Sequence, residues 1–211
     1  AKQLKELGLL VILYARDPQQ GQKAAAELGV DFLHMDVSNE ESISFATTEY
    51  QQRFGKSLDI LINNAGLFPD QEQSILQVQP DLINQALLTN TIGPMLVTQH
   101  FLPLLVNSSH AARVIHLSSK LAQLSTMADT APAYSISKTA LNALTRQQAA
   151  ALADKNISVN AVSPGWVRTD MGGENADLSV QEGADSIVWL ATEAPTTLTG
   201  TFIRNREQIE W

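Results

Sequence analysis

The stretch Leu58-Asp59-Ile60-Leu61-Ile62-Asn63-Asn64-Ala65-Gly66 sets the fold of this chain. Its apolar first half predicts a short strand buried on both faces, and the polar turn that follows is typical of a strand-to-helix connection. Similar apolar runs recur along the chain and end in the same way. We predict strands at residues 9–14, 30–35, 58–62, 112–117, 157–162 and 201–204.

Segments with helical character separate these strands. The first residues resemble the last turns of a helix that ends at Gly8, and the region 80–106 predicts a long helix, bent or interrupted near Gly93-Pro94. Further helices are predicted at 19–28, 38–54, 133–153 and 179–192. The alternation predicts one α/β domain over residues 1–211: a doubly wound, Rossmann-type, mainly parallel sheet with helices on both faces.

Composition narrows the class of function. The net charge is −8, and no cluster of Lys or Arg offers a surface for nucleic acid. The apolar runs are strand-sized, so we expect no membrane span. The chain has no cysteine, which is compatible with a cytoplasmic protein. We expect no metal site, because the four histidines lack the spacing of metal ligands: His34, His100, His110 and His116.

Polar or small residues follow the predicted strands. In parallel sheets ligands bind outside the carboxyl ends of the strands, so we expect these residues to share one edge with Tyr134. They are Arg16, Asp36, Asn63 to Gly66, Ser118-Ser119 and Pro164-Gly165.

Tyr134 and Lys138 form the most chemically informative pair. Four residues apart on a predicted helix, they lie on one face. An ammonium close to a phenol favours the phenolate, so the phenol could exchange a proton with a substrate oxygen. The alternative is a chance pairing, because this spacing occurs on many helices.

Several motifs together resemble the short-chain dehydrogenase/reductase family over essentially the whole chain. They are Asn63-Asn64-Ala65-Gly66, Ser119, Tyr134-x-x-x-Lys138 and Pro164-Gly165-Trp166-Val167-Arg168-Thr169. Within the family the chain looks most like the NADPH-dependent carbonyl reductases. The segment Ser163 to Met171, the terminal Trp211 and Tyr14-Ala15-Arg16-Asp17 carry this likeness.

The resemblance implies a catalytic set. Tyr134 would protonate the carbonyl oxygen as hydride arrives from the nicotinamide, and Lys138 would hold the cofactor ribose and lower the tyrosine pKa. Ser119 would donate a hydrogen bond to the substrate oxygen. Asn90 would bind a water that links Lys138 to solvent, or alternatively mark a helix kink. Trp166 would line the substrate pocket or pack in the core.

The resemblance also implies a cofactor site. It places Asp36 and Val37 beside the adenine, Asn63, Ala65 and Gly66 beneath the adenosine ribose and phosphates, and Pro164, Gly165, Val167 and Thr169 at the nicotinamide end, where Tyr134 and Lys138 also bind. Ala15 stands where NAD-binding folds carry an acidic residue, and Arg16 follows it. An arginine there suits a 2′-phosphate, so we expect NADP(H). Alternatively, Arg16 is a solvated charge balanced by Asp17.

The chain departs from the family pattern in two places. The first strand and its glycine-rich, phosphate-binding turn are absent, and the resemblance places that strand between the runs 9–14 and 58–62. We expect about 25–30 further N-terminal residues in the parent protein; the alternative is a truncated product that does not bind cofactor. The segment 123–133 also lacks the long insertion of single-chain carbonyl reductases, which leaves a homodimer or homotetramer open.

These features together predict NADPH-dependent reduction of a ketone, aldehyde or quinone to an alcohol. One alternative is a non-catalytic dinucleotide-binding protein that acts as a sensor or scaffold. Another is an NAD-linked alcohol dehydrogenase.

Overall fold

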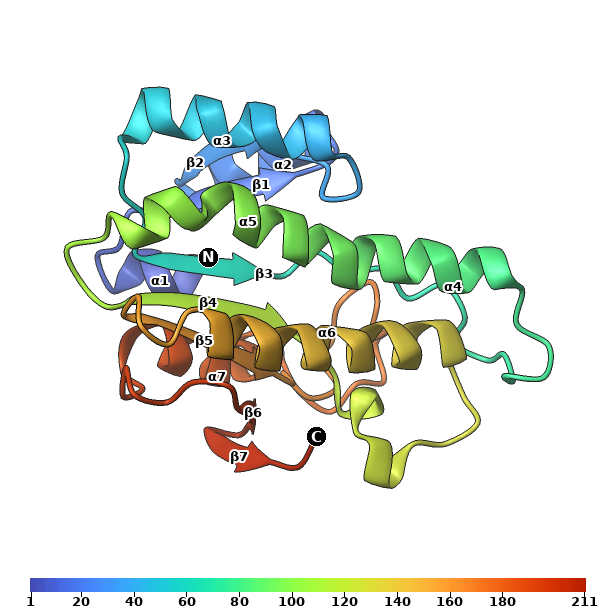
Figure 1. The fold of residues 1–211 in the computed structure, drawn as a ribbon. Helices are drawn as coiled ribbons and strands as arrows, with labels where there is room; N and C mark the ends of the chain where they lie inside the picture. Colours follow the sequence, from blue (N-terminus) through green and yellow to red (C-terminus); the bar gives the residue numbers. More distant parts are fainter.

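A computed structural model describes all 211 residues of the chain. Strands and helices alternate along the sequence, as predicted (Figure 1). The elements are α1 (Lys2–Glu6), β1 (Ile12–Ala15), α2 (Pro18–Leu28), β2 (Asp31–His34), α3 (Glu40–Phe54), β3 (Ile60–Asn63), α4 (Pro80–Leu87), η1 (Leu88–Ile92), α5 (Gly93–Val106), β4 (Ala112–Leu117), η2 (Lys120–Ala122), η3 (Leu124–Thr126), α6 (Pro132–Ala151), β5 (Ile157–Val162), α7 (Val180–Thr192), β6 (Phe202–Arg204) and β7 (Glu207–Ile209).

The strands form two hydrogen-bonded groups. One sheet has the order β3-β4-β5-β6-β7, in which β3 to β6 are parallel and β7 is antiparallel. The strands β1 and β2 form a separate parallel pair. The division falls between β1 and β3, where the resemblance places the family's first strand.

Helices cover both faces of the larger sheet, which confirms the doubly wound α/β class. On one face α3, α5 and α6 pack against the strands around Val114 and Phe101. On the other face α1 and α7 pack around Ile115 and Leu190. Val114 and Ile115 are neighbours in β4, so successive residues of one strand serve opposite cores, as a strand buried on both faces requires.

Some boundaries differ from the predictions. The strand β1 begins at Ile12 rather than at residue 9, and Leu10 is exposed. The expected interruption of the long helix is a π-helical turn, η1, directly before Gly93. The strand β7 was not predicted; Asn205 and Arg206, both with positive φ, turn the chain back from β6 into it.

None of the helices combines the length and the apolar character needed to cross a bilayer.

Candidate active site

The first two turns of α6 carry Tyr134 and Lys138 on one buried face. Tyr134 is 8% exposed and Lys138 3% exposed, and the Lys138 ammonium lies 5.7 Å from the centre of the Tyr134 ring. The ring of Phe68 stacks on the ring of Tyr134, with 4.3 Å between centroids. Phe68 was not among the predicted site residues, because nothing in its local sequence links it to α6.

Burial controls the ionisation of this pair. It raises the pKa of Tyr134 above its usual value, and a side-chain hydrogen bond with Ser119 partly opposes the change. Burial also lowers the pKa of Lys138 to about 8. The predicted lowering of the phenol pKa is therefore not the net effect in this structure, where loss of hydration dominates.

Ser119 lies just beyond the carboxyl end of β4, on the side of Tyr134. Its backbone is extended, with φ −149°, and its hydroxyl accepts a hydrogen bond from the Leu121 amide at 3.2 Å, which starts η2. The hydroxyl therefore has a fixed position beside the phenol, from which its own proton can be donated to a third oxygen.

Asn90 lies in the π-helical turn η1 and is fully buried. Its amide group accepts from Leu67 N–H at 2.7 Å, donates to Leu67 C=O at 2.8 Å and donates to the Ser137 hydroxyl at 2.9 Å. The side chain thus ties the loop after β3 to α6. Its role in binding water stays a prediction.

The end of β1 opens on a hollow of about 920 Å³. Arg16 lines it together with Ala15 and the start of α2, which Asp17 caps through the amides of Gln19 and Gln20. The largest single influence on the pKa of Asp36 is desolvation, which raises it. The hydrogen bonds from Ser38 and the positive charge of Arg16 lower this pKa, and the net effect is a lowered value. The Arg16 guanidinium is therefore close enough to Asp36 to act on its charge.

The residues at the end of β3 and in the turn that follows it differ in burial. The Asn63 side chain points inward and bonds Thr98 and His116, whereas Ala65 and Gly66 are exposed. A Cβ added to Gly66 would lie 3.6 Å from the Lys138 ammonium, so the turn adjoins the face of α6 that carries Tyr134 and Lys138. Any contact of Asn63 with a cofactor would have to come from its backbone.

Val37 adjoins the start of α5. A Cβ added to Gly93 would lie 2.7 Å from the Val37 carbonyl oxygen, so only a glycine allows this approach. Val37 thus has a fixed place beside Asp36, where the resemblance expects the adenine.

The segment after β5 holds the other predicted cofactor residues. Val167 pairs with Leu178, and its side chain packs on α7 at Gly183. The Thr169 hydroxyl donates to Val167 C=O at 3.3 Å and accepts from Gly172 N–H at 3.1 Å. These side chains shape the segment that begins at Pro164-Gly165, and their contacts with a cofactor stay predictions.

Trp166 is 52% exposed, which is inconsistent with core packing. Its indole N–H donates to Gly172 C=O at 2.8 Å, so the ring has a fixed orientation. Of the two interpretations, the wall of a pocket is the one that its exposure allows.

A nicotinamide dinucleotide fits this edge of the sheet on two observations. The Lys138 ammonium has one protein acceptor, Leu117 C=O at 2.7 Å, and therefore keeps two N–H groups for another ligand. Arg16 brings a guanidinium to a hollow large enough for part of a nucleotide. The two positions lie beyond the carboxyl ends of β1 and β4, on either side of the turn after β3.

Comparison with known proteins agrees with this geometry. Residues 1–185 match the family described as enoyl-(acyl carrier protein) reductase. A short-chain dehydrogenase of Penicillium roqueforti, anuI, is 32% identical, and the match covers 96% of this chain and 87% of that protein. The NADPH carbonyl reductase 1 of Bos taurus is 28% identical over 95% of this chain and 88% of its own.

Solved structures show the same fold. The NADPH-bound carbonyl reductase from chicken fatty liver superposes with a TM-score of 0.86 at 29% identity and covers 95% of this chain and 87% of its own. The carbonyl reductase Sniffer of Drosophila melanogaster gives a TM-score of 0.85 at 27% identity, with the same coverage. On its family match and its similarity to these proteins, this chain belongs to the short-chain dehydrogenase/reductase family, whose members are oxidoreductases that use a nicotinamide dinucleotide.

Proposed function

We propose that the protein reduces a ketone, aldehyde or quinone to an alcohol with NADPH as the reductant. The observation that carries this proposal is a buried phenol, Tyr134, which has a buried ammonium and a serine hydroxyl as neighbours at the carboxyl edge of the sheet. NADPH, when bound, supplies the hydride. The residues of the chain supply the proton and orient the carbonyl.

Tyr134 is suited to be the acid. Burial raises its pKa, so the phenol carries its proton at neutral pH. A carbonyl oxygen that gains negative charge during reduction becomes a stronger base and takes that proton. This state of the phenol favours the reductive direction over alcohol oxidation, which needs a phenolate.

Lys138 and Ser119 complete the proton-transfer unit. With a pKa of about 8, the Lys138 ammonium is charged at neutral pH and stabilises the phenolate that remains after the transfer. Ser119 donates a hydrogen bond to the same substrate oxygen, in the manner of an oxyanion hole. Hydride and proton then add to the carbon and oxygen of one carbonyl group.

The preference for NADPH rests on Arg16. Its guanidinium borders the hollow at the end of β1 and can bind a phosphate in a bidentate manner, whereas the neighbouring Ala15 has no carboxylate to bind a ribose hydroxyl. Relatives whose names specify NADPH support this choice.

The direct test is oxidation of NADPH in the presence of a panel of ketones, aldehydes and quinones. We expect turnover with NADPH and a preference of about 10-fold or more over NADH in kcat/KM. The variant Arg16→Gln should lose this preference, because it cannot neutralise the 2′-phosphate. Lys23→Gln, which removes an exposed cation from the same helix region, is the matched control and should keep it.

The other outcomes identify the alternatives. Tight binding of NADPH without turnover of any carbonyl would indicate a sensor, and no binding a scaffold. Preferential turnover with NAD(H) would indicate an NAD-linked alcohol dehydrogenase. Cytoplasmic location and assembly into a homodimer or homotetramer stay predictions.

A further inference from the structure

Asp70 is a buried carboxylate that the proposed chemistry does not use. It lies in the loop between β3 and α4 and is 1% exposed. One of its oxygens accepts from the Ala133 amide at 2.6 Å, and the other accepts from the Tyr134 amide at 3.3 Å. A residue far away in the sequence therefore binds the backbone of the tyrosine itself.

These two bonds complete the N-terminus of α6. The first residue of the helix, Pro132, has no N–H, and Ser135 N–H donates to Ala131 C=O at 2.9 Å. Ala131, in the left-handed region with φ 50°, supplies no side-chain cap. Asp70 thus satisfies both remaining amides of the first turn, and its negative charge lies at the positive end of the helix dipole.

The residues just before Asp70 also bind the catalytic face. We call residues 67–70 the strap. Leu67 is held at both its N–H and C=O by Asn90, and the Phe68 ring covers the Tyr134 ring. The strap therefore contacts the tyrosine at its ring and at its backbone, and it is anchored at both ends.

We propose that Asp70 is a positioning residue for Tyr134: it fixes the first turn of α6 and, through the strap, the place of the phenol. The proposal rests on the function proposed above. The reason for a carboxylate is specific. Two converging N–H donors need two acceptor oxygens, and an amide in their place would turn an NH₂ group toward one of them. A misplaced phenol would still allow cofactor binding but would transfer its proton poorly.

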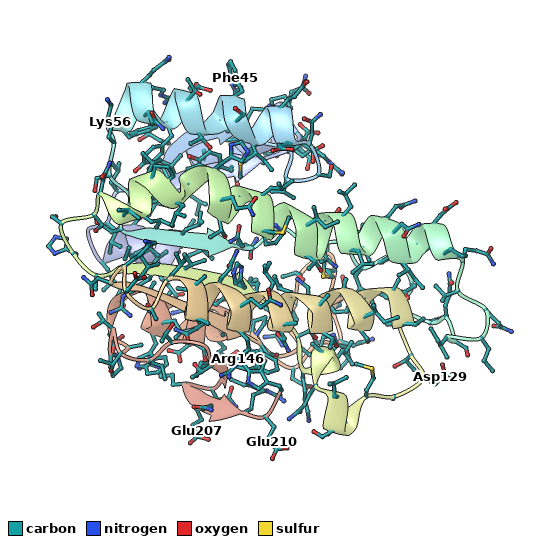
Figure 2. The ribbon with its side chains drawn as sticks, in the orientation of Figure 1. Phe45, Lys56, Asp129, Arg146, Glu207 and Glu210 are labelled. Atoms are coloured by element: carbon teal, nitrogen blue, oxygen red, sulfur yellow. The ribbon has the colours of Figure 1, made fainter.

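Asp70→Asn tests this with a near-isosteric change. We expect kcat to fall about 10- to 100-fold while the dissociation constant of NADPH stays within about twofold, because proton transfer depends on geometry more steeply than binding does. The matched control is Asp129→Asn. Asp129 also holds the loop after β3, through the Ser74 hydroxyl at 2.8 Å and the Ile75 amide at 2.9 Å, but its carboxylate does not accept from an amide of α6. Figure 2 labels Asp129 on the segment that leads into α6. Its variant should keep wild-type kcat.

A second readout does not need turnover. Each protein is titrated in the ultraviolet with Tyr134 present and with Tyr134→Phe added. The difference between the two titrations reports the pKa of this one phenol. Loosening the strap hydrates the phenol, and loss of the carboxylate leaves the helix dipole uncompensated; both changes lower the phenol pKa. We expect a fall of about half a unit or more in Asp70→Asn and none in Asp129→Asn. If Asp70→Asn does not fold, Asp70→Glu takes its place. This variant keeps the charge and both acceptor oxygens, so its kcat and its phenol pKa should fall by less than the amounts expected for Asp70→Asn.

The outcomes separate this proposal from the proposed function. If wild-type protein reduces no carbonyl but the phenol pKa still falls in Asp70→Asn, the function is wrong and the positioning role stands. Wild-type kcat together with an unchanged phenol titration in Asp70→Asn would overturn the positioning role and leave the function intact.

Discussion

At the scale of single residues, burial shifts the pKa values of Tyr134 and Lys138 in opposite directions. Burial keeps the Tyr134 phenol protonated and at the same time weakens the hold of Lys138 on its own proton. A buried ammonium with a single protein acceptor is unfavourable for the fold, so its presence points to a role in function rather than in stability.

Lys138→Met should therefore stabilise the protein while abolishing catalysis. The pKa of Lys138 falls from 10.5 unfolded to about 8 folded. The folded state binds this proton more weakly than the unfolded state, so the group does not penalise folding above pH 10.5. The penalty grows as the pH falls from 10.5 to about 8 and is complete below about 8. At neutral pH the variant should gain on the order of 3 kcal/mol in unfolding free energy, measured by urea denaturation. Equal or lower stability would contradict this account of the buried charge.

The sequence predicts single site residues only where their spacing is local. Tyr134 and Lys138 are one helical turn apart, and Ser119 lies two residues after a strand, so the fold class places them at one edge of the sheet. Asp70 reaches the Ala133 amide across 63 residues, and only the path of the loop brings it there. The sequence carries two weak signals of this contact. Asp70 has no helix of its own to cap, and the N-cap residue of α6, Ala131, has no side chain that could cap the helix.

At the scale of elements, the start of α5 is the critical junction. The π-helical turn η1 presents Asn90 to the strap, and directly after it Gly93 lets α5 approach the backbone of Val37. One continuous helical segment thus contacts both the strap beside Tyr134 and the side on which the cofactor is expected. Figure 1 shows α4, η1 and α5 running beside α6 across the sheet.

Gly93→Ala should disturb this junction. Its methyl group would lie 2.7 Å from the Val37 carbonyl oxygen, which belongs to the backbone and cannot rotate away. We expect a loss of about 1–3 kcal/mol in unfolding free energy together with weaker NADPH binding, measured by denaturation and calorimetry. Gln99→Ala, on an exposed position of the same helix, should change neither. A Gly93→Ala variant with wild-type stability would contradict the close approach.

Strands were predicted correctly where the sequence has a continuous apolar run. Features that depend on tertiary packing or on the conformation of a turn were not predicted. The strands β4 and β5 have the predicted boundaries, because each is buried on both faces. The interruption near Gly93-Pro94 was predicted, but its π-helical form depends on tertiary packing. The strand β7 depends on a two-residue turn at Asn205-Arg206 without glycine. Neither leaves a periodic pattern in the sequence.

At the scale of the whole molecule, helices rather than strands join the two groups of strands. Phe101 of α5 packs edge-on against Tyr14 of β1 and against Tyr50 of α3, with ring centroids 5.9 Å apart in both pairs. Both groups of strands contribute to this core. Deep within the larger sheet, His116 of β4 accepts from Asn63 and donates to Gln148, which fixes a neutral imidazole.

His116 should make global stability depend on pH. Burial lowers its pKa from 6.5 to about 4, so its contribution is complete above pH 6.5 and is lost as the pH falls toward 4, where the unfolded chain binds a proton that the folded chain does not. Over this range we expect the loss to reach about 3 kcal/mol. Chemical denaturation at several pH values would measure it, with His116→Gln as the comparison. An equal pH dependence in both proteins would exclude His116 as its source.

The central claim is that Tyr134 donates the proton during carbonyl reduction, and the most direct measurement is single-turnover reduction by Tyr134→Phe with NADPH already bound. The variant removes one oxygen and leaves the ring beneath Phe68 in place. The account predicts a rate about 100-fold or more below wild type, with NADPH affinity within about twofold. A rate equal to that of wild type would contradict it.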